Sequence, residues 1–425
     1  MLVTIIILLA AAPMPITSQT VKNRQDNIFS ISDLRESHVL NHVATKLSFV
    51  SQTTINVANI EELYSAINRP TIVPTRVILA PGVYMLSAMD SNQMPRPNGG
   101  RIDLKQDMSI QGVEGDRTAV IIDAINLPSS SYEPDGLPNT GAVRMGRGNN
   151  AVEWLTVRNA VNGIAGIETD ISTGATSFVR IAHVVSTGNP RGIDIRSFGM
   201  AMAGRRVVAQ IVDNDLFDNQ ISPGFAGKQG IRIVTVNVPS AVMTVEMSNN
   251  RSHNNQFGIV VENNGTSNAT ISVTSMGDRF YQNGLGASIG GGFSLSSQMA
   301  SNNKVNFSAY GSSFENNDGA NDFERGGFFV FGGQTYAEPM VVSNNSVEVS
   351  LRNCIVSNNQ FYDLSALGAS SEPETIGYPG TNNRATVNLY DTMIPVLVTR
   401  NSIPMFRRDG NIARVFNFST TKQTP

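Results

Sequence analysis

Asparagine-rich turns recur along this chain at intervals of a few tens of residues. They end at Asn219, Asn255, Asn283, Asn317 and Asn359, with spacings of 36, 28, 34 and 42 residues. Weaker turns of the same kind lie near Asn159 and Asn189. A period of about 20 to 50 residues is the signature of proteins built from stacked structural repeats. The chain is therefore expected to fold as a series of similar, stacked coils.

Each repeat contains at least two strand-like segments. An alternating run precedes the turn, as in MTVEMSNN from Met243, and a strand opened by glycine follows it, as in GIDIRS from Gly192. Three residues before the five asparagines lie Leu216, Ser252, Phe280, Phe314 and Val356. These mostly apolar residues are expected to form one internal stack. Parallel stacking of such coils about 4.8 Å apart completes their backbone hydrogen bonds and buries their apolar sides.

Composition agrees with a β-rich fold and excludes several classes of protein. Only 15% of the residues are charged, and 37 glycines punctuate the chain. The net charge of −3, without clustered Lys and Arg, gives no reason to expect a nucleic-acid partner. Cys354 is the single cysteine, so an internal disulfide and a cysteine-based zinc site are excluded, and it is expected in the core.

The amino-terminal part of the repeat region carries a resemblance to a known superfamily. A helix-like segment, IEELYSAIN from Ile60, is followed by ILAPGVY from Ile78 and by MSIQGVEGDRTAVIID from Met108. With the Asn and Gly repeats, this pattern resembles the pectate-lyase-like (pectin lyase fold) superfamily. The resemblance implies an all-β, right-handed parallel β-helix with an N-terminal capping helix. The catalytic motifs of pectate lyases, polygalacturonases and pectin methylesterases are not found, so no specific enzyme family is matched.

Four segments are predicted along the chain. Residues 1–18 are interpreted as a signal peptide, because the apolar run 2–12 is shorter than the roughly 20 residues that span a bilayer. Residues 19–54 form a lead-in, 55–395 the β-helix with its cap, and 396–425 a C-terminal cap or tail. We therefore expect a secreted monomer, extracellular or at the cell surface, with no transmembrane segment in the mature chain.

Polar residues align on the outside of the glycine-opened strands. The outward column is predicted to run Arg144, Glu168, Asp194, Arg232, Val260, Ser288 and Phe329. A neighbouring outward column holds Asp170, Arg196 and Glu262. The extra residues of the unequal repeats fall at 220–229 and 318–326, which we expect to form loops at one corner. Function is expected on the face between these loops.

Two enzymatic interpretations of this column remain open, beside a solvated ladder of salt bridges. In a lyase, Glu168 and Asp194 would hold Ca²⁺ against a uronate carboxylate, and Arg232 would remove the acidified proton, by analogy with pectate lyases. In a glycoside hydrolase, Asp194 and Glu168 would be the acid and base pair. The substrate-binding residues would be Arg144, Arg196 and Phe329 in either case.

A second acidic segment offers oxygen ligands for Ca²⁺. The loop from Asn316 contains Asp318 and Asp322 beside the aromatic strand at Phe329, although its spacing differs from that of an EF-hand. A flexible acidic loop is the alternative. The sequence therefore leaves two functions open: a secreted enzyme acting on an extracellular polysaccharide, with Ca²⁺ as its candidate cofactor, or a non-catalytic surface, adhesive or glycan-binding protein.

Overall fold

The computed structural model describes most of the chain after residue 51. The described residues are 52–70, 73–128, 141–146, 148–161, 165–169, 176–199, 203–219, 228–294, 299–318, 326–335, 342–371, 380–392, 394–400 and 410–418. They belong to one compact unit, Phe49–Pro425. The predicted signal peptide and nearly all of the predicted lead-in lie outside the described residues.

Three long sheets contain almost all strands of the described part. The 12-stranded sheet has the order β1 (Thr53–Val57), β2 (Thr75–Leu79), β5 (Met108–Gln111), β8 (Asn149–Glu153), β11 (Thr176–Ala182), β14 (Arg206–Val212), β17 (Val242–Ser248), β20 (Thr270–Met276), β24 (Lys304–Tyr310), β28 (Ser346–Arg352), β31 (Arg384–Tyr390) and β33 (Ile412–Asn417). The 10-stranded sheet has the order β4 (Ile102–Asp103), β7 (Gly141–Met145), β10 (Ala165–Thr169), β13 (Arg191–Phe198), β16 (Gln229–Val236), β19 (Phe257–Asn264), β22 (Leu285–Ser294), β26 (Gly326–Thr335), β30 (Leu364–Ser371) and β32 (Leu397–Arg400).

The third sheet and a short pair complete the strand inventory of the described part. The 9-stranded sheet has the order β3 (Gly82–Ser87), β6 (Val120–Asn126), β9 (Thr156–Arg158), β12 (Val185–Thr187), β15 (Asp215–Phe217), β18 (Arg251–His253), β21 (Arg279–Tyr281), β25 (Ser313–Glu315) and β29 (Ile355–Ser357). The strands β23 (Ala300–Ser301) and β27 (Val342–Ser343) form a separate pair.

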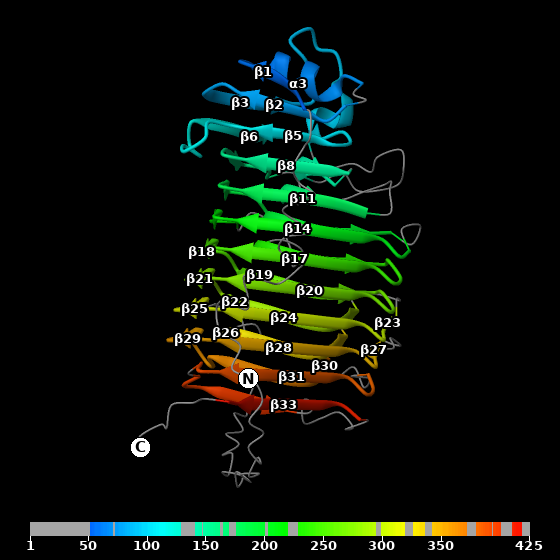
Figure 1. Ribbon diagram of the computed structural model, residues 1–425, viewed down its shortest axis with the longest axis vertical. Coiled ribbons are helices and arrows are strands. Elements are labelled where there is room, and N and C mark those ends of the chain that lie inside the picture. Colours follow the sequence, from blue (N-terminus) through cyan, green and yellow to red (C-terminus); the bar gives the residue numbers. More distant parts are fainter. Residues whose placement is uncertain are drawn as a thin grey trace, which may run out of the picture. The chain divides into compact units, whose positions relative to one another are not determined.

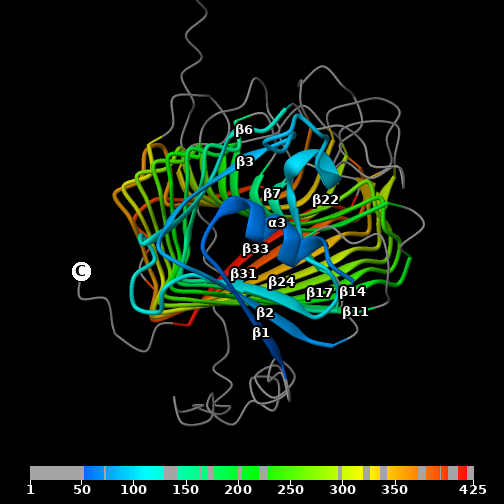
Figure 2. The ribbon, with the colours of Figure 1, turned by 90° about the horizontal axis from the view of Figure 1, so that it is seen from above.

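The chain visits the three sheets in turn and then repeats the circuit. Thus β11, β12 and β13 are followed by β14, β15 and β16, and each strand pairs in parallel with its counterpart in the next coil. Figure 1 shows the resulting stack of strands, and Figure 2 shows the superposed coils from above. The fold is a right-handed parallel β-helix, as predicted.

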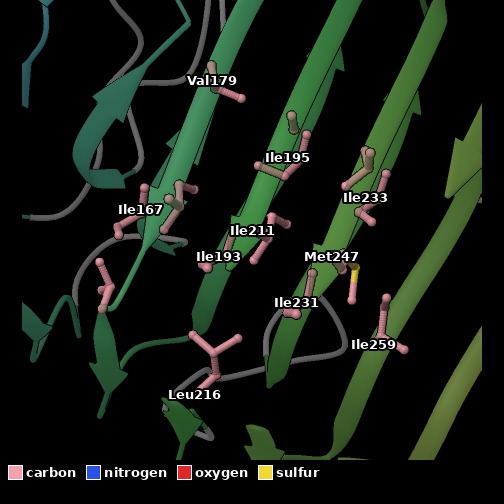
Figure 3. Close-up of a cluster of buried hydrophobic side chains, with 14 of the residues drawn as sticks. Ile167, Val179, Ile193, Ile195, Ile211, Leu216, Ile231, Ile233, Met247 and Ile259 are labelled. Carbon is pink, nitrogen blue, oxygen red and sulfur yellow. The ribbon is translucent and has the colours of Figure 1, made fainter. Parts of the chain in front are cut away.

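Apolar side chains in register fill the interior of the coils. Ile167, Ile193, Ile231 and Ile259 are partners on successive strands of the 10-stranded sheet (Figure 3). The predicted internal stack is also confirmed, because Leu216, Ser252, Phe280, Phe314 and Val356 are successive partners with 0% exposure. Ser252, its polar member, donates a hydrogen bond from Oγ to the carbonyl of Gly258 at 2.8 Å.

The asparagines of the repeat form a ladder at the turn between the 9-stranded and 10-stranded sheets. The backbone N–H of Asn219 donates to Oδ1 of Asn255 at 3.0 Å, and Asn255 donates in the same way to Asn283 at 3.1 Å. The same bond continues through Asn317 to Asn359. Each asparagine therefore satisfies a buried backbone group of the coil before it.

Another corner, between the 12-stranded and 9-stranded sheets, has a left-handed residue in each of several successive coils. Asn249 and Asn353 have φ values of 56° and 50° there, as suits asparagine. Trp154 and His183 occupy the equivalent positions with φ values of 57°, which is unfavourable for bulky side chains. Their rings stack with centroids 3.9 Å apart, and His183 Nδ1 lies 2.8 Å from Oδ2 of Asp213.

The N-terminal end of the coil interior is covered by α3 (Ile60–Asn68). Its N-cap, Asn59, accepts a hydrogen bond from the backbone N–H of Glu62 at 2.9 Å. Leu63, Ala66 and Ile67 are buried on one face of the helix, which packs against the first strands. Figure 2 shows α3 above the centre of the coils. A single 3₁₀ turn, η1 (Pro97–Gly100), follows in the next connection.

At the other end, parallel pairing continues beyond the predicted boundary at residue 395. β32 pairs with β30, and β33 pairs with β31 as the last strand of the 12-stranded sheet. The segment predicted as a C-terminal cap or tail thus contributes strands to the coils. In the described part of the chain, no helix is long and apolar enough to cross a membrane.

Candidate functional site

The outward column predicted on the glycine-opened strands lies in continuous register on the 10-stranded sheet. Glu168 is the partner of Arg144 on one side and of Asp194 on the other. Asp194 is followed by Arg232, and the column continues through Val260, Ser288 and Phe329. Asp103 of β4 is the partner of Arg144 and begins the column. Asp170 of the neighbouring column lies outside the described residues.

At Gly192, steric crowding explains why the strand opens with a glycine. A Cβ atom at this position would lie 2.6 Å from the carbonyl oxygen of Gly230 and 3.1 Å from Nδ2 of Asn219. Only glycine therefore lets the strand pass this close to the asparagine ladder and to the next coil. This constraint fixes the start of β13 and so the position of Asp194 two residues later.

The charged residues of the column other than Arg232 are buried, although they point away from the coil interior. Glu168 and Asp194 have 0% exposure, Arg144 has 2%, and Arg196 in the neighbouring column has 4%. This differs from the solvated ladder that was the alternative interpretation. Every residue of β10 and of β26 is buried, so both faces of these strands are covered.

Ion pairs join most of the charges in what we call the charged lattice, defined by Arg144, Glu168, Arg191, Asp194, Arg196, Arg232 and Glu262, in which Arg144 is included as the strand partner of Glu168. Arg191 Nη1 lies 2.8 Å from Oδ2 of Asp194, and Arg232 Nη1 lies 3.9 Å from the same oxygen. Glu168 pairs with Arg196 at 3.1 Å, and Glu262 pairs with Arg232 at 3.1 Å. Charges buried so deeply are stable only when they are paired in this way.

The guanidinium groups keep Asp194 ionised. Burial by itself would raise the pKa of this carboxyl, but Arg191, Arg232 and Arg196 outweigh it and hold the pKa below its usual value. Burial and the neighbouring cation of Arg232 lower the pKa of Arg191 in turn. Asp194 is therefore an ionised acceptor of hydrogen bonds and a weak base.

One carboxylate oxygen of Asp194 lacks a hydrogen-bond partner. Oδ2 contacts Arg191, whereas Oδ1 is buried and has no hydrogen-bond partner among the described residues. An unmatched buried acceptor costs about 1 to 3 kcal/mol, and such groups in folded proteins call for a specific explanation. Because Oδ1 is enclosed, a ligand can reach it only if the surrounding side chains move.

The column changes from charged to apolar along the helix axis. The apolar patch consists of Phe257, Val260, Leu285, Phe329, Phe331 and Leu367, all buried outside the coil interior. The Phe329 and Phe331 rings have centroids 5.4 Å apart. Phe331 lies over Gly290, where an added Cβ would meet its ring at 2.1 Å. Phe329, predicted as a platform for sugar, is 7% exposed.

The described residues of the lattice do not fit a calcium site. Ca²⁺ takes six to eight oxygen ligands, about 2.3 to 2.6 Å from the metal. Around Glu168 and Asp194 the nearest charged groups are guanidinium nitrogens, which compete for the same oxygens. Among the described residues, no group of three or more His, Cys, Asp or Glu could hold a metal ion. Asp318 is exposed, and Asp322 lies outside the described residues.

Sequence reasoning missed two members of the site. Arg191 and Gln229 precede the opening glycines and are partners of one another, and Arg191 Nε donates to Oε1 of Gln229 at 2.8 Å. The next partners in this column are Phe257 and Leu285. The residue before each opening glycine thus changes from polar to apolar along the chain, as the predicted outward column does. This parallel in the sequence could have identified Arg191 and Gln229 as members of the site.

Comparisons with known proteins assign the chain to no family. No protein-family model matches the chain, and no curated protein matches it. Among solved structures, the A-module of the mannuronan C-5 epimerase AlgE4 of Azotobacter vinelandii matches with 14% identity and a TM-score of 0.45, over 89% of this chain and 94% of that one. The periplasmic alginate epimerase AlgG matches with 12% identity and a TM-score of 0.38, over 90% of this chain and 89% of that one.

A viral protein gives a match of the same order. ORF18 of Geobacillus virus E2 has 9% identity and a TM-score of 0.39, over 93% of this chain and 65% of that one. These values transfer no activity, and the coiled architecture rests on the strand pairing described above.

Proposed function

We propose that the protein is an exported β-helix protein that binds an extracellular polysaccharide at the charged lattice. The observation that carries the proposal is the set of paired charges around Asp194, an ionised carboxylate with one unmatched oxygen; this set of charges becomes accessible at its edge. Saccharides present hydroxyl groups that donate to a carboxylate and accept from guanidinium groups. The partly exposed Arg232 and Glu262, each with 12% of the side chain accessible, are where a ligand would first contact the lattice.

The apolar patch supports the same assignment. It continues the outward column directly, because Val260 is the partner of Arg232 and Phe329 follows two strands later. A sugar chain presents hydroxyl edges and apolar C–H faces, so a surface that is charged at one end and aromatic at the other suits it. This arrangement needs no further cofactor for binding.

Proton abstraction from a bound uronate, as in a lyase, is the second candidate function. Asp194 is ionised, as a base must be, but the arginines that lower its pKa also make it a weak base, so this function is less well supported than binding. A glycoside hydrolase meets the same obstacle, because its acid must carry a proton at working pH and the neighbouring arginines oppose protonation of Asp194. Glu168, the other member of the predicted pair, is bound to Arg196.

Binding and turnover by purified protein on a panel of acidic and neutral polysaccharides test the proposal. We expect binding by the wild type and a loss of at least tenfold in affinity for Asp194→Asn and for Arg232→Gln. Ser308→Ala, an outward residue of the 12-stranded sheet, is the control. Formation of unsaturated products that Asp194→Asn abolishes would select the lyase. Equal binding by the wild type and both lattice variants would refute the site.

Export has a separate test. The apolar run 2–12 predicts cleavage near residue 18, and this part of the chain lies outside the described residues. Expression of the full chain in a secreting host should release a protein whose amino terminus, read by intact mass, begins close to residue 19. Retention of the uncut chain inside the cells would contradict export by a cleaved signal peptide.

A further inference from the structure

A cavity of about 490 Å³ lies at the N-terminal end of the 12-stranded sheet, whereas the charged lattice lies on the 10-stranded sheet. Its floor is an outward column of this sheet, in which Asn56, Ile78 and Gln111 are successive partners. The turns after β1, β2 and β5 form its sides and bring Pro81 and Val113 to its lining. The volume falls within the range of about 300 to 1,000 Å³ that small ligands occupy.

The side-chain oxygen Oε1 of Gln111 has no hydrogen-bond partner among the described residues. The residue is 7% exposed, its Oε1 is fully buried, and it lines the cavity. Its neighbour in the column, Glu153, is instead engaged with Arg180 at 2.8 Å. The unmatched oxygen leaves this side chain without the hydrogen bonds that would fix it, so a ligand in the cavity can bond to the accessible part of the amide without breaking an existing bond of the side chain.

The charges around the cavity restrict the ligand. Glu62 and Glu114 line it, and no Lys or Arg does so among the described residues. Glu62 accepts hydrogen bonds from the backbone N–H of Ala58 and from the Asn59 side chain, both at 2.7 Å, whereas Glu114 is exposed. An anionic ligand would be repelled here. A neutral ligand with hydroxyl groups can donate to the carboxylates and accept from the Gln111 amide.

We propose that this cavity is a second saccharide site, which takes a neutral sugar unit. Asn56 and Gln111 provide amide groups, Glu114 provides a carboxylate acceptor, and Ile78 with Val113 provides an aliphatic surface for the C–H face of the ring. The charged lattice, with its arginines, belongs to a separate face of the protein. The two sites therefore differ in the charge of the sugar that they accept.

Titration calorimetry of the full-length protein with a neutral oligosaccharide panel and an acidic one of equal length tests this site. We expect a neutral member to bind, and Gln111→Leu to weaken it at least tenfold. Gln210→Leu, outward on β14 of the same sheet, is the matched control and should bind like the wild type. Glu114→Gln should raise the affinity for the acidic sugar at this site.

The outcomes separate this proposal from that for the lattice. Asp194→Asn should leave neutral-sugar binding at the cavity unchanged, and Gln111→Leu should leave binding at the lattice unchanged. Absence of neutral-sugar binding at millimolar concentration, or an equal loss with Gln111→Leu and Gln210→Leu, would overturn the cavity site. Thermal melts of all variants establish that a loss of binding does not reflect unfolding.

Discussion

Asp278 should make the β-helix less stable at neutral pH than in mild acid. It occupies the short turn before β21, in the column that holds Asn214 and Asn250 in the two preceding coils. Asp278 is fully buried and accepts hydrogen bonds from Asn250 and from Ser275. Burial raises the pKa of its carboxyl from 3.8 to about 6, although these hydrogen bonds oppose the rise.

The direction of the pH effect follows from the two pKa values. Below about pH 3.8 the carboxyl is protonated in both the folded and the unfolded chain. Between about pH 3.8 and 6 the unfolded chain releases the proton first, so the free energy of unfolding falls as pH rises. The difference of about 2.2 pH units corresponds to about 3 kcal/mol, fully lost above about pH 6.

Replacing this residue by the asparagine of the neighbouring coils removes the ionisation. We expect Asp278→Asn to increase the free energy of unfolding by up to about 3 kcal/mol at pH 7.5 and to change it little at pH 4. Denaturant unfolding followed by circular dichroism at both pH values measures the difference. Asp218→Asn, at an exposed turn position, is the control. A lower stability of Asp278→Asn at pH 7.5, or an equal change at both pH values, would refute the reasoning.

Three further predictions concern the core and the lattice. Asp194→Asn removes the partner of the buried Arg191 and should lower the free energy of unfolding by about 3 to 5 kcal/mol in denaturant titrations, whereas a change below 1 kcal/mol would contradict a tightly paired lattice. Phe280→Ala empties a fully buried position stacked on Phe314 and should cost about 3 to 5 kcal/mol, measured in the same way; a fully reversible melt at the wild-type temperature would disprove it. Burial raises the pKa of the Cys354 thiol, so a thiol reagent at pH 8 should label the folded protein far more slowly than the denatured one, and equal rates would show an accessible thiol.

The sequence was sufficient to predict the coil and its register. Residues that alternate in a strand can only point into or out of the coil, and the Asn and Gly positions fix which strand lies beside which. The partners of Glu168, Asp194 and Arg232 therefore follow from alignment of the repeats alone. The stack from Leu216 to Val356 follows for the same reason.

The burial of the lattice could not be predicted in the same way. The alternation of apolar and polar residues in β13 predicts that Asp194 points away from the coil interior. An outward side chain can nevertheless be covered by other parts of the chain. Arg191 and Asp194 are three positions apart, and in a regularly alternating strand such residues point to opposite faces. Their ion pair could therefore not be predicted from the alternation of side chains. The ion pair between Arg117 and Asp213 joins residues 96 positions apart, beyond the reach of any local pattern.

The stacked pair at the left-handed corner gives the protein an optical probe of its own. Trp154 is the single tryptophan of the chain, and its indole lies 3.9 Å from the imidazole of His183. Light absorbed at the red edge of the protein spectrum therefore excites one defined place in the coils. Because a stacked imidazole changes the emission of an indole, the fluorescence of the unlabelled protein reports the closure of this corner.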